Sequence, residues 1–390
     1  MINEKPLEGV RVLEFARVLA GPWAGQLLAD LGADVIKIEN PDGGDETRHW
    51  GPPFVDDPNG AERSAAYFHA CNRGKRSVAL DLKKTEDLDV AKALCVEADV
   101  IIENFKVGTM DRLGLGFETV RQSKPGMVYC SITGFGQTGP YKDRAGYDFI
   151  IQGMSGFMSI TGEADGQPMK AGVAITDILT GLYAVSAINA SLVKALKSGA
   201  GTHIDISLME VMAASLANQN MNYLATGTAP TRLGNAHPNI APYQVVPTSD
   251  GHIIIAAGND GQFKRLCTLL GLERRAAVSH FATNGARVEN RKVLTDALEQ
   301  ETVQWTRDAL VEACAEHGVP AGPINTIADM FSDAQIRGRG LQIETLGGIS
   351  GVRSPLFINS SPAADLRTSP SLGEHTEFIK AHALTCWPEQ

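Results

Sequence analysis

The sequence lacks the motifs on which several common functions depend. It has no uninterrupted apolar run of the roughly 18 residues that a membrane-spanning helix needs. Its N-terminus has no basic region followed by a long apolar core, so we expect no signal peptide. No GxGxxG segment follows the first expected strand, and neither GxxxxGK[ST] nor HExxH occurs, which disfavours a dinucleotide site, a phosphate loop and a zinc protease.

The spacing of the cysteines and the net charge also disfavour a zinc site and binding to nucleic acid or membranes. The six cysteines form no CxxC pair and have no histidine at zinc-binding spacing, so we expect free thiols in a reducing cytoplasm. The 35 Lys and Arg residues are outnumbered by 45 Asp and Glu, which gives a net charge of −10. This balance argues against nucleic acid or a membrane as a partner, although it is compatible with a local basic pocket.

Strand-like and helical segments alternate in the N-terminal third of the 390 residues. The pattern predicts strands at 9–15, 33–41, 76–82, 99–105 and 127–136, with helices at 21–32, 84–98 and 117–125. Repeated β–α–β units of this kind predict an α/β fold with an open, parallel, Rossmann-like sheet flanked by helices. Such sheets bind ligands beyond the carboxyl ends of their strands.

The rest of the chain predicts a second, smaller domain inserted into the first. Residues 150–225 are expected to be mostly helical, including 205–225, whereas 243–258 reads as two antiparallel strands around a Ser-Asp-Gly turn. We therefore predict a large domain at 1–224, a small α+β domain at 225–325, and a return segment at 326–390 that completes the large domain.

One carboxylate, Asp177, lies in the otherwise apolar stretch "GVAITDILTG" at 172–181. An unpaired carboxylate is costly to bury, so such a group is usually hydrogen-bonded, shifted in pKa, or reactive. Two interpretations fit the pattern. Asp177 either caps the helix that follows, or it is a nucleophile or base held at the helix start.

Several segments together resemble a known family. They are "LEGVRVLEFARVLAGPWAGQLLADLGADVIKIENPDGGDETR", "NRGKRSVALDLK", "ENFKVGTMDRLGLGFE", "SITGFGQTGPYKDRAGYD", "GVAITDILTGLYA" and "PSLGEHTEFI". In order and spacing the chain resembles, nearly end to end, the class III coenzyme A transferases, a group that includes formyl-CoA transferase and carnitine CoA-transferase and has α-methylacyl-CoA racemase as a relative.

The resemblance implies a mechanism and an assembly. Asp177 would attack an acyl-CoA thioester and form a mixed anhydride, which the CoA thiolate would convert to an aspartyl-CoA thioester. An acceptor carboxylate would then displace the CoA. No cofactor would be permanently bound, because coenzyme A enters as a substrate, and the protein would be an interlocked homodimer. Water must be excluded because anhydrides and thioesters hydrolyse.

The resemblance also implies residues for binding CoA, whose phosphates favour Arg and Lys at strand ends. The candidates are Arg17, Val18, Ala20, Arg73, Lys75, Asn104, Phe105, Lys106, Met110 and Arg112. One departure is that Asn40 stands where the formyl-CoA transferases carry a basic residue, so a phosphate contact is not expected there. In the small domain, Gly258, Asn259 and Gly261 either form a lid over the aspartate or make an ordinary turn.

Within the family the residues favour transfer over racemisation. The racemase uses a histidine directly before an aspartate, whereas here Tyr147 precedes Asp148, and a tyrosine is a poor base for that proton. The chain looks closest to the branch that uses succinyl-CoA and dicarboxylic acids. The cation for the second carboxylate would be Arg17, Arg48 or His49. An oxalate-type or carnitine-type acceptor is the alternative.

Overall fold

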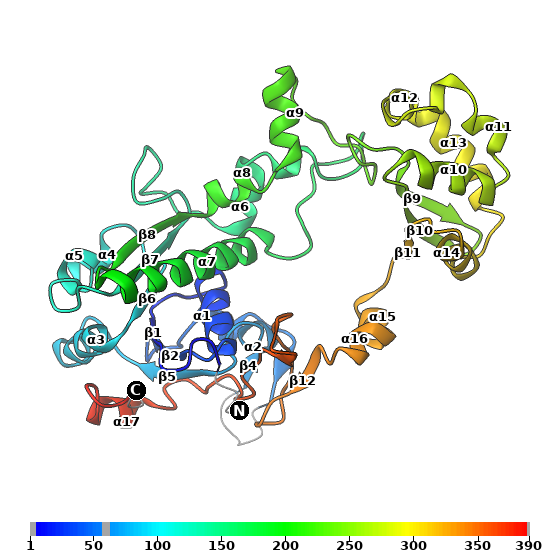
Figure 1. The fold of residues 1–390 in the computed structure, drawn as a ribbon. Helices are drawn as coiled ribbons and strands as arrows, with labels where there is room; N and C mark the ends of the chain where they lie inside the picture. The colour runs from blue at the N-terminus through cyan, green and yellow to red at the C-terminus, as the bar shows by residue number, and fades with distance from the viewer. Residues whose placement is uncertain (1–4, 57–62, 388–390) are drawn as a thin grey trace. The chain divides into compact units, whose positions relative to one another are not determined.

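The computed structural model describes residues 5–56 and 63–387, which form two compact units (Figure 1). The larger unit comprises Met1–Phe157, Lys170–Met221 and Ala334–Gln390, and the smaller comprises Met158–Met169 and Asn222–Asp333. Contacts thus group 158–169 and 326–333 with the smaller unit, whereas the sequence analysis assigned them to the large domain. The domain boundaries stay a prediction.

The larger unit is built on a six-stranded, wholly parallel sheet in the order β5-β2-β1-β6-β7-β8. Its strands are β1 (Arg11–Glu14), β2 (Asp34–Glu39), β5 (Lys75–Ala79), β6 (Val100–Glu103), β7 (Val128–Thr133) and β8 (Thr202–Ser207). The parallel α/β fold is confirmed. The helical prediction for 205–225 is wrong at its start, because 205–207 belong to strand β8.

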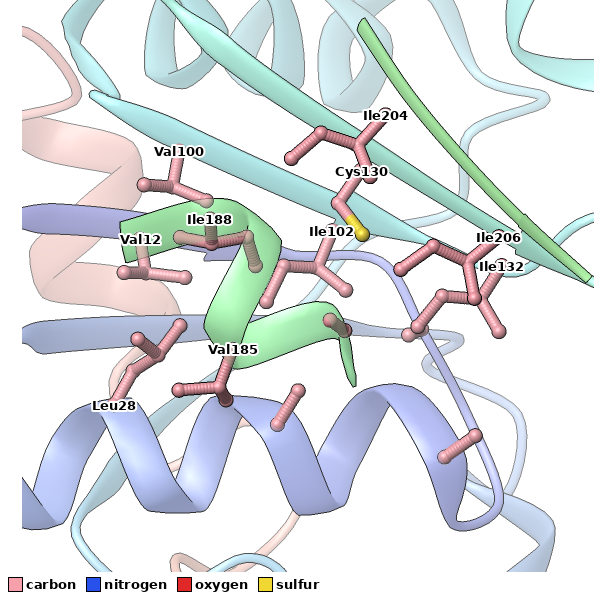
Figure 2. Packing of buried hydrophobic residues seen from close by; sticks show 14 of the residues in the cluster. Val12, Leu28, Val100, Ile102, Cys130, Ile132, Val185, Ile188, Ile204 and Ile206 are labelled. Atoms are coloured by element: carbon pink, nitrogen blue, oxygen red, sulfur yellow. The ribbon is translucent and has the colours of Figure 1, made fainter. Parts of the chain in front are cut away.

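Both faces of this sheet are covered by helices. On one face α1 (Ala20–Asp30) and α7 (Ile175–Ser198) pack on the strands, and Figure 2 shows Leu28 of α1 and Val185 and Ile188 of α7 with the strand side chains of this core. On the other face α3 (Thr85–Glu97) and α17 (Thr376–Ala381) pack with a second buried cluster. Because both faces are buried, the strands read as nearly continuous apolar runs.

Helix α7 has the length and composition of a membrane span, with a mean hydropathy of 1.4. In the fold it is a core helix on one side, where Gly181, Ala184 and Ile188 are buried against α1 and the sheet. A Cβ on Gly181 would come within 2.9 Å of the Ala20 carbonyl oxygen, so this glycine permits the close approach of α1 and α7. Other positions of α7 expose large apolar side chains such as Tyr183 and Leu196.

Shorter elements complete the larger unit. They are β3 (Phe54–Val55), β4 (Ser64–Ala65), η1 (Glu46–His49), α2 (Ala66–His69), α4 (Thr109–Arg112), α5 (Phe117–Val120), α6 (Asp148–Met154), η2 (Phe157–Ser159, shared with the smaller unit), α8 (Leu208–Ala214), α16 (Ala334–Gly338), β12 (Gln342–Glu344), β13 (Ser350–Val352), β14 (Phe357–Ile358) and β15 (Ser361–Pro362). Residues close to the C-terminus return to this unit. The buried guanidinium of Arg73 pairs with Asp30 and also donates to the backbone carbonyl of Asp365, whose own N–H donates to Asp30 at 2.7 Å.

The smaller unit contains the predicted antiparallel pair, β9 (Tyr243–Thr248) and β10 (Gly251–Ala256), joined on the far side of β10 by β11 (Ala321–Pro323). Its helices are α9 (Asn218–Thr226, shared with the larger unit), α10 (Asp260–Leu269), α11 (Glu273–Ala276), η3 (Ser279–Phe281), α12 (Asn284–Glu289), α13 (Arg291–Thr302), α14 (Arg307–Glu316) and α15 (Ile327–Ser332). A separate apolar cluster forms its core.

Candidate active site

The strand order places a ligand crevice between β1 and β6. Chain order along the sheet reverses at this point, because β2 and β5 lie on one side of β1 while β6, β7 and β8 lie on the other. Ligands of open parallel sheets bind beyond the carboxyl ends of the strands at such a switch point. The residues that follow β1 and β6 here are Arg17–Val18 and Asn104–Phe105, four of the predicted CoA-binding residues.

These residues are in direct contact. The Asn104 side chain accepts a hydrogen bond from the Arg17 N–H at 3.0 Å and donates one to the Arg17 carbonyl at 2.8 Å. The Arg17 guanidinium pairs with Glu46 and lies 5.7 Å from the centre of the Phe105 ring. Its Nε is buried and has no hydrogen-bond partner among the described residues. The Arg17 side chain as a whole is partly exposed, so its guanidinium can still meet an anion.

The loop between β1 and α1 holds a strained residue. Val18 has φ = 70°, a left-handed conformation that costs a β-branched residue roughly 1–2 kcal/mol. The Asp45 carboxylate accepts the Val18 N–H at 3.2 and 3.3 Å, and the Cys71 thiol lies 3.6 Å from the Val18 carbonyl oxygen. The loop is therefore held from two sides. Strain of this kind clusters at functional sites.

Asp177 lies in the first turn of α7 and does not cap it. The N-cap residue is Ala174, which makes no side-chain capping bond, so the capping interpretation of Asp177 is wrong. The capping hydrogen bond comes instead from Asp148, which accepts the N–H of Thr176 at 2.8 Å. Asp148 also accepts a hydrogen bond from the side-chain amide of Gln152. This side chain is fully buried, and its oxygen accepts the Ala171 N–H.

The electrostatics of Asp177 are those of a reactive carboxylate. No hydrogen bond or ion pair reaches its carboxylate from residues 5–56 or 63–387. Burial, and after it the negative charge of Asp148, raises the pKa of Asp177 to about 7. These two effects outweigh the helix N-terminus, which favours negative charge. At neutral pH a large fraction of this group is ionised and poorly solvated, which suits a nucleophile.

The crevice loop and Asp177 are neighbours because α1 and α7 touch where the loop ends. The Ala20 carbonyl lies against Gly181, one helical turn beyond Asp177. One turn is about 5.4 Å along the axis. Val18, Ala20 and Asp177 therefore lie in one region of the larger unit, as the CoA site and the nucleophile of a transferase must.

Tyr67 is a site residue that the sequence analysis missed. Burial, followed by the charge of Asp177, raises the pKa of the Tyr67 hydroxyl to about 12, so the two groups are within electrostatic range. Trp50 packs edge-on against the Tyr67 ring, with the ring centres 5.4 Å apart. Nothing in the sequence pattern singled out Tyr67, because it lies in a four-residue helix, α2, between segments without a periodic pattern.

Two predicted CoA contacts have other roles in this structure. The Lys75 ammonium is fully buried and donates to both oxygens of Glu14, to the Pro22 carbonyl and to Asn72, each at 2.9 Å. Arg73 is occupied by Asp30 and Asp365, as described above. Neither cation has exposed surface with which to meet a phosphate, so the structure uses both within the protein.

Two further predicted contacts line a cavity of about 160 Å³ at the carboxyl ends of β6 and β7. Lys106 and Met110 line this cavity together with Glu103, whose pKa burial raises to about 7, and His203, whose pKa burial lowers. Arg112 is exposed and donates to Thr109 at 2.9 Å. Asn40 is exposed, and its side chain accepts the Asp42 N–H in a turn.

The three candidate cations for a second carboxylate differ in availability. Arg48 is buried, holds Glu39 with two hydrogen bonds of 2.7 and 2.8 Å, and lies 3.6 Å from the centre of the Phe68 ring. It has no access to a substrate. Arg17 is partly exposed, and His49 is exposed with one ring nitrogen 2.9 Å from the Gly43 carbonyl oxygen. The structure leaves Arg17 and His49 as candidates.

The glycine segment of the small unit forms the start of α10. The Gly258 N–H donates to the Gln262 side chain at 2.8 Å, and Asn259 caps the helix by accepting the Gln262 N–H at 2.9 Å. Asp260 pairs with Arg287, a fully buried residue. An ordered strand-to-helix turn is thus present. The proposed lid role stays a prediction.

The fold, the crevice and the isolated carboxylate define an enzyme that handles an acyl-CoA, and the sequence model of the CoA-transferase family III matches residues 7–376. The chain belongs to this family and is a transferase for which coenzyme A is a substrate. Among the described residues, no cluster of His, Cys, Asp or Glu has the geometry of a metal site.

Individual proteins of this family show which CoA-transferases the chain resembles. The chain is 57% identical to a succinate–glutarate CoA-transferase of Agrobacterium fabrum, over 99% of this chain and 98% of that one. It is 41% identical to a human succinyl-CoA:glutarate CoA-transferase, over 98% of this chain and 87% of that one. The crystal structure of a CAIB/BAIF family protein from Brucella suis superposes with a TM-score of 0.87 at 55% identity, covering 98% of this chain and 100% of that one.

Proposed function

We propose that the protein transfers coenzyme A from succinyl-CoA to a small dicarboxylic acid such as glutarate. The observation that carries the proposal is Asp177, a half-buried carboxylate with no hydrogen-bond partner in the described structure and a raised pKa, one helical turn from the point where the crevice loop meets α7. The names of the relatives support the choice of succinyl-CoA and glutarate.

The reaction proceeds by covalent exchange at Asp177. A carboxylate oxygen of Asp177 attacks the thioester carbonyl and the C–S bond breaks. The CoA thiolate departs, and the product on the enzyme is a succinyl–aspartyl anhydride. The thiolate attacks the aspartyl carbonyl and releases succinate, which leaves an aspartyl-CoA thioester. The acceptor carboxylate then displaces the thiolate to form a second anhydride. Attack of the thiolate on the acceptor's acyl carbon gives the new thioester and restores Asp177.

Arg17 and the cavity beside Lys106 supply the binding interactions in this proposal. The partly exposed guanidinium of Arg17 faces an anion of CoA or the second carboxylate of the acceptor, since a charge-assisted hydrogen bond suits either group. Lys106 is exposed at the rim of the cavity and reaches the CoA phosphates. No cofactor is permanently bound.

A homodimer is part of the proposal, with the chains interlocked and the small unit an insertion between two parts of the large one. The exposed apolar side chains of α6 and α7, among them Phe149, Tyr183 and Leu196, need a cover, and a second copy of the chain provides one. Light scattering should give about twice the 41.6 kDa of one chain. A stable monomer at micromolar concentration would contradict the assembly.

We place the protein in the cytoplasm, where its buried free thiols stay reduced.

The function is tested with Asp177→Asn and a substrate panel. The unaltered protein, given succinyl-CoA and a series of mono- and dicarboxylic acids, should yield the new CoA thioesters by mass spectrometry. With acyl-CoA and hydroxylamine or borohydride, it should carry a modification at Asp177 in the peptide map. Asp177→Asn should bind CoA and lose transfer by several orders of magnitude. An active Asp177→Asn enzyme would refute the mechanism.

A further inference from the structure

Six charged side chains form a buried network beneath the loop between β1 and α1. The acids are Glu14, Glu39 and Asp45, and the bases are Lys37, Arg48 and Lys75. Every member is less than a tenth exposed, and the three charges of each sign balance. A buried ionic network is often no more stable than apolar side chains of the same volume, so stability alone does not account for it.

Asp45 is the member that joins this network to the crevice loop. One of its carboxylate oxygens lies 2.9 Å from the Lys37 ammonium, at the centre of the network. Both oxygens lie 3.2–3.3 Å from the Val18 nitrogen, and one also accepts the N–H and hydroxyl of Thr47. The carboxylate is 1% exposed, so it cannot exchange these partners for water.

Val18, the residue that Asp45 holds, has the conformation that L-residues avoid. At φ = 70° the branched Cβ of valine crowds the backbone, and glycine is the residue that adopts this region freely. A hydrogen bond from a fixed, buried carboxylate to the Val18 N–H opposes relaxation of the loop.

The left-handed turn at Val18 determines where its neighbours lie. The residue before it is Arg17. The Arg17 N–H is hydrogen-bonded to Asn104, and its guanidinium lies near the Phe105 ring and forms an ion pair with Glu46. Leu19 and Ala20, after it, begin α1 where the Ala20 carbonyl meets Gly181 of the helix that carries Asp177. Relaxing Val18 to negative φ would turn Arg17 out of the crevice.

We propose that Asp45, anchored by Lys37, is a positioning residue that holds Val18 in the left-handed conformation and so presents Arg17 and the α1 terminus to acyl-CoA. The inference rests on the proposed function, in that the loop binds acyl-CoA. Asp45 itself touches neither substrate nor Asp177 in this assignment. Asp45 also caps η1, whose Glu46 pairs with Arg17, and asparagine retains this capping ability, so the proposed effect is the one on the Val18 backbone.

Rescue by glycine tests this assignment. Asp45→Asn should raise KM for succinyl-CoA and the calorimetric Kd for CoA by about tenfold or more, with a smaller effect on kcat. Val18→Gly alone is the baseline against which the double variant is scored, because the valine side chain itself lies in the predicted CoA site. In the double variant glycine adopts φ near 70° without the carboxylate, so most of the lost CoA affinity should return.

Glu39→Gln is the control within the same network. Glu39 contacts Arg48, Ser77 and the Asp45 N–H but makes no bond to Val18, and the glutamine side-chain oxygen can still accept the Asp45 N–H. Glu39→Gln should lower the melting temperature and leave the Kd for CoA unchanged, and Val18→Gly should not restore the melting temperature. A double variant of Asp45→Asn with Val18→Gly that binds CoA no better than Asp45→Asn overturns the positioning role. Equal rescue of Glu39→Gln by Val18→Gly overturns it as well.

Val18→Pro tests the same geometry from the loop if Asp45→Asn does not fold. Proline holds φ near −65° and lacks the N–H, so CoA affinity should fall by about tenfold or more. Unchanged CoA affinity in Val18→Pro overturns the inference. Failure of the proposed function is distinguishable, since it would appear as absent CoA transfer by the unaltered protein, whereas CoA affinity is measured by calorimetry without turnover.

Discussion

The Asp148 carboxylate accepts the backbone N–H of Thr176 at 2.8 Å and thereby caps α7 from a position 28 residues earlier in the chain. Because Asp148 supplies the cap, the carboxylate of Asp177 is left without a structural hydrogen bond. The same negative charge helps to raise the pKa of Asp177. Of the two aspartates near this helix start, Asp148 caps the helix and Asp177 is the proposed nucleophile.

The raised pKa of Asp177 predicts a pH-dependent stability cost. An unfolded aspartate has its usual pKa near 3.9, whereas the folded group has a pKa of about 7, so the folded state binds the proton more tightly. The cost is absent below pH 4, grows as the pH rises to 7, and is constant above. Asp177→Asn removes it. The variant should be more stable by roughly 1–3 kcal/mol at pH 8 and equal to the parent near pH 3.5, as measured by denaturant titration. A variant that is less stable at every pH would contradict the assignment.

Asp148 should also set the pH at which the enzyme becomes active. Since Asp177 must be ionised to attack, kcat/KM for acyl-CoA should rise with pH toward a midpoint near 7. Asp148→Asn retains much of the capping ability but removes the negative charge, so this midpoint should move to lower pH. Burial still acts in the variant, and the midpoint should therefore stay above 4. The pH–rate profile of the two proteins is the measurement, and an unchanged midpoint would show that the charges are not coupled.

Lys75 and Lys106 are both predicted CoA contacts, but substituting them should have different effects on stability and on CoA binding. Lys75→Met leaves Glu14 buried with Lys37 as its remaining cation, so unfolding should become easier by about 3–5 kcal/mol. Lys106→Ala changes an exposed side chain and should alter stability by less than about 0.5 kcal/mol. It should weaken CoA binding by roughly 1–3 kcal/mol, as for a charge-assisted hydrogen bond. Thermal melts and calorimetry separate the two effects. Normal stability of Lys75→Met would refute the structural role.

Gly181→Ala should disturb the contact between α1 and α7. The new Cβ would come within 2.9 Å of the Ala20 carbonyl oxygen and 3.0 Å of the Trp23 ring, and backbone cannot move aside easily. We expect a loss of about 1–3 kcal/mol in stability together with reduced transfer activity. Gly285→Ala is the control, since it too lies in a helix and its Cβ would meet nothing within 4 Å. It should gain up to about 1 kcal/mol. A neutral Gly181→Ala would mean that the helices separate without cost.

The sheet was predictable because burial on both faces gives strands an unbroken apolar signature. The predicted strands at 9–15, 33–41 and 99–105 contain β1, β2 and β6. Strand β8 was missed since its alternating pattern, with Ile204 and Ile206 buried and His203 and Asp205 exposed, runs directly into helix α8. No Gly or Pro separates the two elements, and the one local signal of the boundary is Ser207 followed by Glu210, the pattern of a helix N-cap.

The site was predictable only where a local pattern carries it. Asp177 stood out as a charge in an apolar stretch, and Arg17 and Asn104 as polar residues after strands. The burial of Lys75 was not visible, because its partner Glu14 lies 61 residues away and only the sheet brings them together. The same holds for Tyr67, whose nearness to Asp177 depends on the packing of a short helix.

The late return of the chain to the sheet has a consequence for the order in which the protein is made. The buried pair of Arg73 and Asp30 is completed by backbone groups of Asp365, 335 positions after Asp30. During synthesis the Arg73–Asp30 pair stays incomplete until the segment around 365 has left the ribosome. A truncated product that ends before 365 would leave the buried Arg73 guanidinium and the Asp30 carboxylate each without one hydrogen-bond partner.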